Sequence, residues 1–173
     1  MTQESNLYSI LRGMIREEIG ELSARSEWPA SLRSEVSILG AVLLDNAALE
    51  EVKDLSTDEL SLASHVTILE TMRTMRRHQQ AIDLVTLANE LGADALIEVG
   101  GMAYLASLTE GLPRQPALSE YMLILKEKAK LRRIMTACKE ATELCEAQST
   151  DSGEIVAQLG VALKGIRAKE KKQ

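Results

Sequence analysis

The run from Ala117 to Ala147 constrains the fold most, because it contains neither Gly nor Pro and its composition favours helix throughout. As one α-helix it would extend about 45 Å. The polar segment from Gln148 to Ser152 follows, and Asp151 and Glu154 have the spacing of a capping box. A second apolar stripe then comprises Ile155, Leu159, Ala162, Leu163 and Ile166. Two long helices joined by a short loop predict an antiparallel helical hairpin.

Shorter helices are predicted before the hairpin. Pro29 opens a helix whose apolar face would hold Leu32, Val36, Leu39 and Leu43. Asn46 is a suitable N-cap for a short helix through Val52. Residues 56–59 fit a capping box ahead of a longer helix. The buried face of that longer helix would hold Leu62, Val66, Leu69, Met72 and Met75.

Glycines delimit the next elements. Asp83 can cap a helix from Leu84 to Leu91, which Gly92 would terminate. The pair at 100–101 forms the next break, before a short helix over residues 102–110. A turn is a better interpretation of this pair than an anion site.

The expected fold class is all-α, with a small globular helical bundle followed by a long antiparallel helical hairpin. The absence of Phe and the single Trp leave a core of Leu, Ala, Ile, Val and Met, which suits helices. We expect an extra N-terminal helix and connector over residues 1–30, a globular subdomain over 31–113, the hairpin over 114–169 and a basic tail over 170–173.

The N-terminal segment has its own helical pattern. Apolar residues recur at three- and four-residue spacing, which predicts an amphipathic helix over residues 7–22. They are Leu7, Ile10, Leu11, Met14, Ile15, Ile19 and Leu22. This stripe is too wide to remain in water, so the helix either packs on its own domain or occupies a partner's groove.

Motifs of nucleotide hydrolysis and metal binding are missing. The sequence has no phosphate-binding loop, no dinucleotide fingerprint and no HExxH, so we expect no catalytic, cofactor or metal site. His65 and His78 lack partner ligands, and we expect His65 to be a satisfied, partly buried residue. The two cysteines, Cys138 and Cys145, are expected to be small buried hydrophobes rather than a redox pair.

Charge and hydropathy limit the partners and the compartment. The formal net charge is −6, and the basic clusters at 73–78 and 126–133 are too local for strong nucleic-acid binding. No apolar run approaches the length of a membrane span, and the N-terminus does not look like a signal peptide. We expect a cytoplasmic protein.

A resemblance to a known family rests on an ordered set of segments. Residues 35–46 read EVSILGAVLLDN, 64–72 read SHVTILETM, 82–87 read IDLVTL and 99–105 read VGGMAYL. Tyr121 and the segment 124–132 complete the set. In this order the segments resemble the N-terminal domain of the bacterial DnaB replicative helicase, over roughly residues 31–147.

The resemblance implies a non-catalytic assembly and docking domain. In that family, hairpins pair between subunits, three pairs form a collar, and the collar receives the C-terminal helical domain of primase. The expected partners are therefore a second copy of the chain, as a dimer or trimer of dimers, and primase, with a helicase ATPase domain or helicase loader as further partners. The candidate interface residues are Tyr121, Ile124, Leu131, Arg132, Arg133, Ile134, Met135, Ile155, Leu159 and Leu163.

Three function classes stay open from the sequence. The first is the N-terminal domain of a helicase in DNA replication, and the second is a free-standing paralogue that regulates helicase loading or primase recruitment. The third is an unrelated helical scaffold or nucleic-acid binder, which the acidic balance disfavours.

Overall fold

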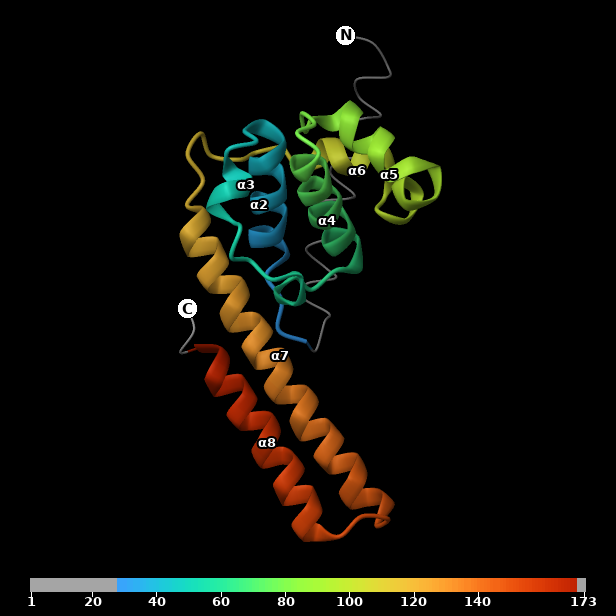
Figure 1. The fold of residues 1–173 in the computed structure, drawn as a ribbon, viewed down its shortest axis with the longest axis vertical. Helices are drawn as coiled ribbons and strands as arrows, with labels where there is room; N and C mark the ends of the chain where they lie inside the picture. Colours follow the sequence, from blue (N-terminus) through green and yellow to red (C-terminus); the bar gives the residue numbers. More distant parts are fainter. Residues whose placement is uncertain (1–27, 171–173) are drawn as a thin grey trace.

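A helical globular part and a projecting two-helix hairpin make up the structure (Figure 1). The computed structural model describes residues 28–170, and its regular structure in that range is helical throughout. The globular part contains α2 (Leu32–Leu44), α3 (Ala48–Glu51), the 3-10 helix η1 (Thr57–Glu59), α4 (Ala63–Arg77), α5 (Leu84–Glu98) and α6 (Gly101–Ser107). The hairpin contains α7 (Leu118–Ala147) and α8 (Ser152–Glu170). The predicted all-α class is confirmed. The predicted helix over residues 7–22 lies outside the described residues, as do residues 171–173 of the predicted tail.

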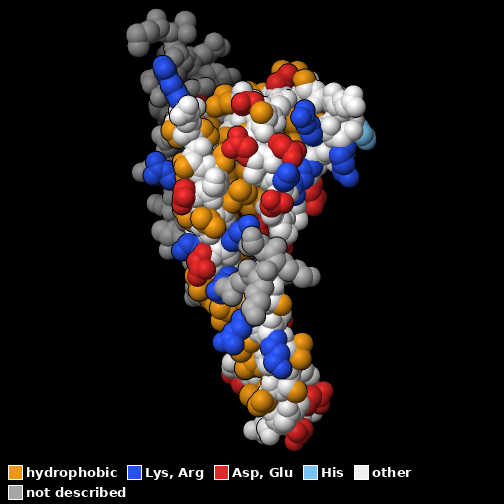
Figure 2. All heavy atoms as spheres, turned by 60° about the vertical axis from the view of Figure 1, so that its left-hand side comes forward, with side chains coloured by type: hydrophobic (Ala, Val, Ile, Leu, Met, Phe, Trp, Pro, Cys, Tyr) orange, Lys and Arg blue, Asp and Glu red, His pale blue; other side chains and the backbone are white. Residues whose placement is uncertain are grey.

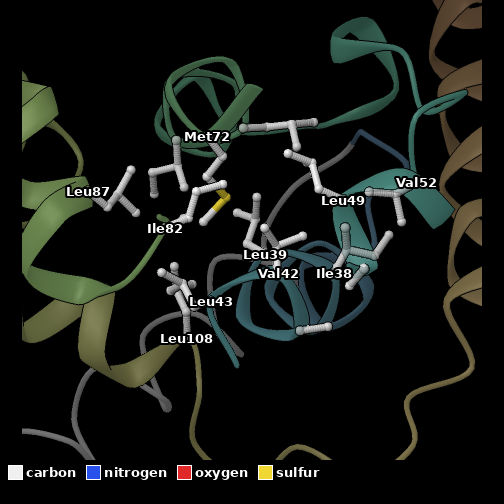
Figure 3. Packing of buried hydrophobic residues seen from close by; sticks show 14 of the residues in the cluster. Ile38, Leu39, Val42, Leu43, Leu49, Val52, Met72, Ile82, Leu87 and Leu108 are labelled. Atoms are coloured by element: carbon white, nitrogen blue, oxygen red, sulfur yellow. The ribbon is translucent and has the colours of Figure 1, made fainter. Parts of the chain in front are cut away.

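α2 is the central helix of the globular part. Ile38, Leu39 and Val42 have no exposed surface, and their side chains meet those of α3 and α4 (Figure 3). Of the predicted apolar face, Leu32, Leu39 and Leu43 are buried and Val36 is half-buried, but Ser34, Glu35 and Ser37 are buried as well. Helices and loops on several sides cover α2, so its buried residues no longer follow one stripe.

Gly40 of α2 permits the closest approach to the end of α6. A Cβ atom at this position would lie 2.0 Å from the carbonyl oxygen of Leu108. No side chain larger than hydrogen fits there without moving backbone. Gly40 therefore fixes how tightly α6 packs on the central helix.

The buried face of α4 differs from the predicted one in two positions. Leu69, Met72 and Met75 are buried as predicted. His65 and Ile68 take the remaining core positions, whereas Leu62 and Val66 are half-buried. The capping box of Ser56 and Glu59 is present, with the Ser56 amide donating to Glu59 Oε2 at 3.0 Å, but it caps η1.

Asn46 does not cap α3, so that prediction is wrong. Its side-chain amide donates to the carbonyl of Ile82 at 2.7 Å, and its Oδ1 accepts from the Ile82 amide at 2.9 Å. Asp45 Oδ1 instead accepts from the Ala47 amide. Asn46 thus joins the end of α2 to the connection between α4 and α5.

The two predicted glycine breaks have different outcomes. Asp83 caps α5 as predicted, accepting from the amides of Val85 and Thr86. Gly92 has φ 72°, yet the chain resumes its helix and continues to Glu98, so Gly92 is a kink and not the end. Gly100, with φ 100°, precedes α6, which ends at Ser107 rather than Glu110.

The hairpin agrees closely with the prediction. α7 runs unbroken from Leu118 to Ala147, and α8 returns antiparallel to it (Figure 1). Asp151 begins α8 by accepting from the Gly153 amide through Oδ2 at 2.9 Å and from the Ile155 amide through its carbonyl. The polar break at 148–151 is therefore a short inter-helix loop.

Candidate functional site

A buried polar network lies where the globular part meets the hairpin. Glu35 of α2 and His65 of α4 are both 0% exposed. Glu35 Oε2 lies 2.6 Å from His65 Nδ1, while Glu35 Oε1 accepts from the Ser61 amide at 2.9 Å and from the Ser61 hydroxyl. A buried carboxylate of this kind is stable only because each oxygen has a donor.

Tyr104 of α6 completes the network from the other side of His65. Its hydroxyl lies within hydrogen-bond distance of His65 Nε2. Burial, with a smaller contribution from the charge of Glu35, raises the pKa of Tyr104 to about 12. The phenol therefore stays protonated at neutral pH and supplies a donor to the imidazole.

Arg132 attaches α7 to backbone segments beside this network. Its guanidinium donates to the carbonyls of Pro29 at 2.8 Å, Glu59 at 2.9 Å and Leu60 at 3.1 Å. Burial lowers the pKa of Arg132, and the charge of Glu35 acts in the opposite direction. The donors of Arg132 bind its own chain, and its predicted contact with a partner stays a prediction.

Arg133 pairs with a carboxylate instead of with backbone carbonyls. It pairs with Asp58, the nearest oxygen being Oδ2 at 2.6 Å, and both side chains are partly exposed. An ion pair in solvent contributes at most about 1 kcal/mol. Arg133 is thus the member of the predicted pair that a partner could still engage.

The network is an anchor and not a reaction centre. Its central groups have no exposed surface, and among the described residues every buried side-chain nitrogen or oxygen has a hydrogen-bond partner. A side chain that is fully paired and closed to solvent cannot take a substrate. Its role is to hold α2, α4, α6 and α7 together.

One side of α7 packs against its own chain. Leu125 and Ala129 are buried against the globular part, and Ala137 is buried in the hairpin. On α8, Ile155 and Ile166 are buried on the side that meets α7. These residues close the hairpin as an ordinary apolar seam.

The other side of α7 keeps a second apolar stripe at the surface. Leu131 is 37% exposed and Met135 38% exposed, and Cys138 is exposed as well. Successive residues of an α-helix advance by about 100°, so these three residues share one line along α7. That line is about 110° away from the seam with α8.

α8 exposes an apolar stripe on the same side of the hairpin. Val156 is 71% exposed and Leu163 is 38% exposed. They lie about 80° from the α8 seam, and because α8 runs antiparallel to α7, both stripes turn to one side. We call the surface formed by Leu131, Met135, Cys138, Val156 and Leu163 the open face. Figure 2 shows apolar patches between basic side chains along the hairpin.

The remaining predicted interface residues lie elsewhere. Tyr121 is half-buried against the globular core, Ile134 and Leu159 are half-buried, and Ile155 is buried in the seam. Ile124 is exposed on α7. The prediction that Cys138 and Cys145 are buried is wrong, since both are exposed on the outer side of α7.

Sequence reasoning did not single out three residues of the network and the open face. Glu35 and Tyr104 were parts of quoted motifs, but they are 30 and 39 residues from His65, and no local pattern joins them. Val156 could have been found from the spacing of seven to Leu163, which defines a second stripe beside the predicted one. His65 is satisfied, as predicted, but fully buried.

Within residues 28–170, no helix is long and apolar enough to cross a membrane. The same range holds no group of His, Cys, Asp or Glu side chains suited to a metal ion.

Fold and surface together define an all-helical module with a rigid globular part and a hairpin with an apolar side. Residues 27–127 match the family described as the DnaB-like helicase N terminal domain. This match covers more than half of the chain, and the chain belongs to that family.

Curated relatives support the family. The replicative DNA helicase DnaB of Geobacillus stearothermophilus is 33% identical over 139 residues, which are 79% of this chain and 30% of that helicase. DnaB of Pasteurella multocida is 34% identical over 119 residues, 68% of this chain and 26% of that helicase. The chain thus spans less than a third of these relatives.

Solved structures support the fold. The N-terminal domain of DnaB helicase from Mycobacterium tuberculosis matches with a TM-score of 0.73 at 26% identity, covering 80% of this chain and 99% of that chain. A DnaB-like replicative helicase, whose structure was described with its interactions with primase, matches with a TM-score of 0.61 at 21% identity. This match covers 80% of this chain and 31% of the helicase.

Proposed function

We propose that this chain is a non-catalytic assembly and docking domain in DNA replication, as the N-terminal domain of a replicative helicase. It pairs with a second copy through its hairpin, and such pairs build a collar that receives the helical domain of primase. The compartment that this role implies is the cytoplasm. No ATP is bound or hydrolysed by this segment, because its sequence encodes no phosphate loop.

The open face carries this proposal. It places apolar side chains from two helices on one side of a projecting hairpin, where residues 28–170 leave them exposed. Aqueous exposure of a contiguous apolar strip is unfavourable, and a second hairpin with the same strip can cover it by two-fold symmetry. Four helices packed in this way form an ordinary bundle.

Docking of primase is the second part of the proposal. A DnaB-like helicase of the same fold has described interactions with primase, which supports the same class of partner here. Arg133 and the exposed Ile124 are the residues we assign to this contact. Arg132 is not among them, because its guanidinium holds the hairpin to the globular part.

A free-standing regulator of helicase loading or primase recruitment is the alternative. It uses the same open face and the same docking residues. The two differ in whether the partner hairpin belongs to a second copy or to a helicase.

Sedimentation of the full chain tests the assembly. We expect association at high micromolar concentration, weakened by Leu131→Asp, which places a carboxylate on the open face. Leu159→Asp, which points into the seam, should instead lower the stability of the hairpin. A chain that stays monomeric at high micromolar concentration would contradict self-assembly.

Calorimetric titration with the primase helical domain, at two salt concentrations, tests docking. Binding should weaken as salt rises and weaken further in Arg133→Glu, because exposed charges are screened. Lys53→Glu, at an exposed residue of the globular part that pairs with Glu50, is a charge-matched control. Absence of binding by a verified dimer would contradict the docking part of the proposal.

A further inference from the structure

Charge is distributed unevenly along the hairpin. We call residues 139–160 the tip, and residues 118–138 together with 161–168 the root. The tip has five acidic side chains and one basic one, whereas the root has seven basic side chains and two acidic ones. The acidic residues of the tip are Glu140, Glu143, Glu146, Asp151 and Glu154, and all five are exposed. The hairpin therefore has a negative tip, visible in Figure 2 at the end farthest from the globular part, and a positive root.

One charge of each sign lies beside the open face on the same edge of α7. Lys128 in the root and Glu146 in the tip are 18 residues apart, about five helical turns, so they point in one direction about 27 Å apart. That direction is about 50° from the open-face line of α7, on the edge away from α8. Glu127, the exposed acidic neighbour of Lys128, is about 100° farther round, on the other edge.

Neither of these two charges is neutralised by the described part of the chain. Within residues 28–170 no ion pair includes Lys128 or Glu146. By contrast, Lys139 in the tip lies 3.8 Å from Glu143, and Arg133 in the root pairs with Asp58. Lys128 is half-buried and Glu146 is exposed. Both are thus available to a second molecule that covers the open face.

The centre of the open face lies midway between the two charges. The loop of the hairpin is residues 148–151, so Val156 and Leu163 of α8 lie about level with residues 143 and 136 of α7. The open face therefore extends along α7 from Leu131 to about the level of residue 143, with its centre near residue 137. Residue 137 is also midway between residues 128 and 146.

Antiparallel pairing about this centre brings opposite charges together. A two-fold rotation that reverses the hairpin covers one open face with the other, and it places Glu146 of each copy beside Lys128 of the other copy. A parallel pair would instead place tip beside tip and root beside root, where like charges repel. The apolar strip allows both arrangements, whereas the charges favour the antiparallel one.

We infer that two copies of the chain pair with their hairpins antiparallel, and that reciprocal ion pairs between Lys128 and Glu146 set this direction and register. The inference rests on the proposed function, since it specifies how a second copy occupies the open face. Burial of the apolar strip drives association, and the two ion pairs select the partner that carries the opposite charge at each end.

Charge reversal tests the ion pairs, by sedimentation equilibrium of the full chain at low ionic strength. Glu146→Lys alone, or Lys128→Glu alone, places like charges together at both contacts and should weaken self-association about tenfold. The double variant, and an equimolar mixture of the two single variants, should associate as the wild type does. Glu140→Lys makes the same change in the tip, about 170° from the open face, and should match the wild type.

Spin labels at the tip test the direction of pairing. In a full chain with Cys138→Ala and Cys145→Ala, a nitroxide is attached at Ser149→Cys in the exposed loop. The two labels of an antiparallel pair should lie about 36 Å apart, because each is about 12 residues from the centre. Those of a parallel pair would lie within about 20 Å, since packed helices are about 10 Å apart. Double electron–electron resonance measures this separation.

The results separate this inference from the proposed function. Labels within about 20 Å of each other, or equal association of Glu146→Lys and Glu140→Lys, would overturn the antiparallel ion pairs and leave assembly through the open face intact. A full chain that stays monomeric at high micromolar concentration would contradict the proposed function and this inference together.

Discussion

The globular part and the hairpin differ in where they place polar and apolar side chains. The globular part buries polar groups: Glu35 and His65 have no exposed surface, and each is fully paired. The hairpin exposes apolar groups, with Val156 at 71% exposed and unneeded for the seam with α7. The difference teaches that packing within the chain explains the globular part, whereas the exposed apolar side of the hairpin supports the proposed contact with a partner.

This contrast also explains what the family motifs do. Residues 35–46 supply Glu35, Gly40 and Asn46, which serve the network, the α6 packing and the Ile82 contact. The segment over 99–105 supplies Gly100 and Tyr104. The motifs that identify the family are therefore chiefly structural, and the open face lies outside most of them.

The largest expected effect is the loss of the buried carboxylate. Glu35→Ala leaves Ser61 and His65 without their acceptor in a closed interior, and should lower the free energy of unfolding by about 3–5 kcal/mol. Denaturant titration measures this. Glu50→Ala, which removes an exposed partner of Lys53, should change stability by less than about 1 kcal/mol. An equal loss of stability in Glu35→Ala and Glu50→Ala would contradict the claim that the buried network stabilises the fold more than the surface ion pair does.

Gly40→Ala should cause the next largest loss of stability. Its new Cβ would meet the Leu108 carbonyl at 2.0 Å, and overpacking of this kind costs about 3 kcal/mol. The gain in helix propensity is smaller, about 1 kcal/mol. Gly165→Ala in α8 has nothing within 4 Å and should stabilise by up to about 1 kcal/mol. The same substitution would thus have opposite signs in the two regions, and thermal unfolding of both variants checks this.

Arg132→Met should have an intermediate effect on stability. It keeps the apolar stem but removes the donors to four backbone carbonyls, at a cost of about 2 kcal/mol. Arg133→Met removes an ion pair that is partly in solvent and should cost less than about 1 kcal/mol. If chemical denaturation ranked the two the other way, Arg132 would not be the residue that holds the hairpin.

Tyr104 gives the smallest effect, which appears at alkaline pH. The pKa of Tyr104 is raised from 10.0 to about 12, so the folded state holds the proton more tightly than the unfolded chain. Its contribution to stability is complete below about pH 10 and is lost as the pH rises towards 12. Stability measured across this range should fall more steeply for the wild type than for Tyr104→Phe. If the stability of both proteins fell in parallel, another titrating group would be the cause of the loss of stability at alkaline pH.

Local patterns predicted the helices well. Asp83, Asp151 and the run without Gly or Pro define α5, α8 and α7, because caps and breakers act on their neighbours in sequence. Contacts between distant segments were not predictable in this way. Asn46 has the composition of a cap, but a loop 36 residues away competes for its amide.

The surface was harder to predict than the fold. Arg132 and Arg133 are adjacent and chemically identical, yet Arg132 is held by the carbonyls of four residues and Arg133 pairs with the partly exposed carboxylate of Asp58. Helix rotation decides this, and rotation depends on packing against η1 and α2. Cys138 and Cys145 were wrongly predicted to be buried. The apolar character of a helical residue does not show which side of the helix the rest of the chain covers.

Two valines of α8 provide the most direct test of the open face. Val156 and Val161 are 71% and 70% exposed, but they lie about 140° apart around the helix, and only Val156 is on the open face. Sedimentation equilibrium of Val156→Asp, Val161→Asp and wild type compares equal chemistry on two sides of one helix. We expect Val156→Asp to weaken self-association at least about tenfold and Val161→Asp to match the wild type. Equal association of the two variants would contradict the assignment of this face.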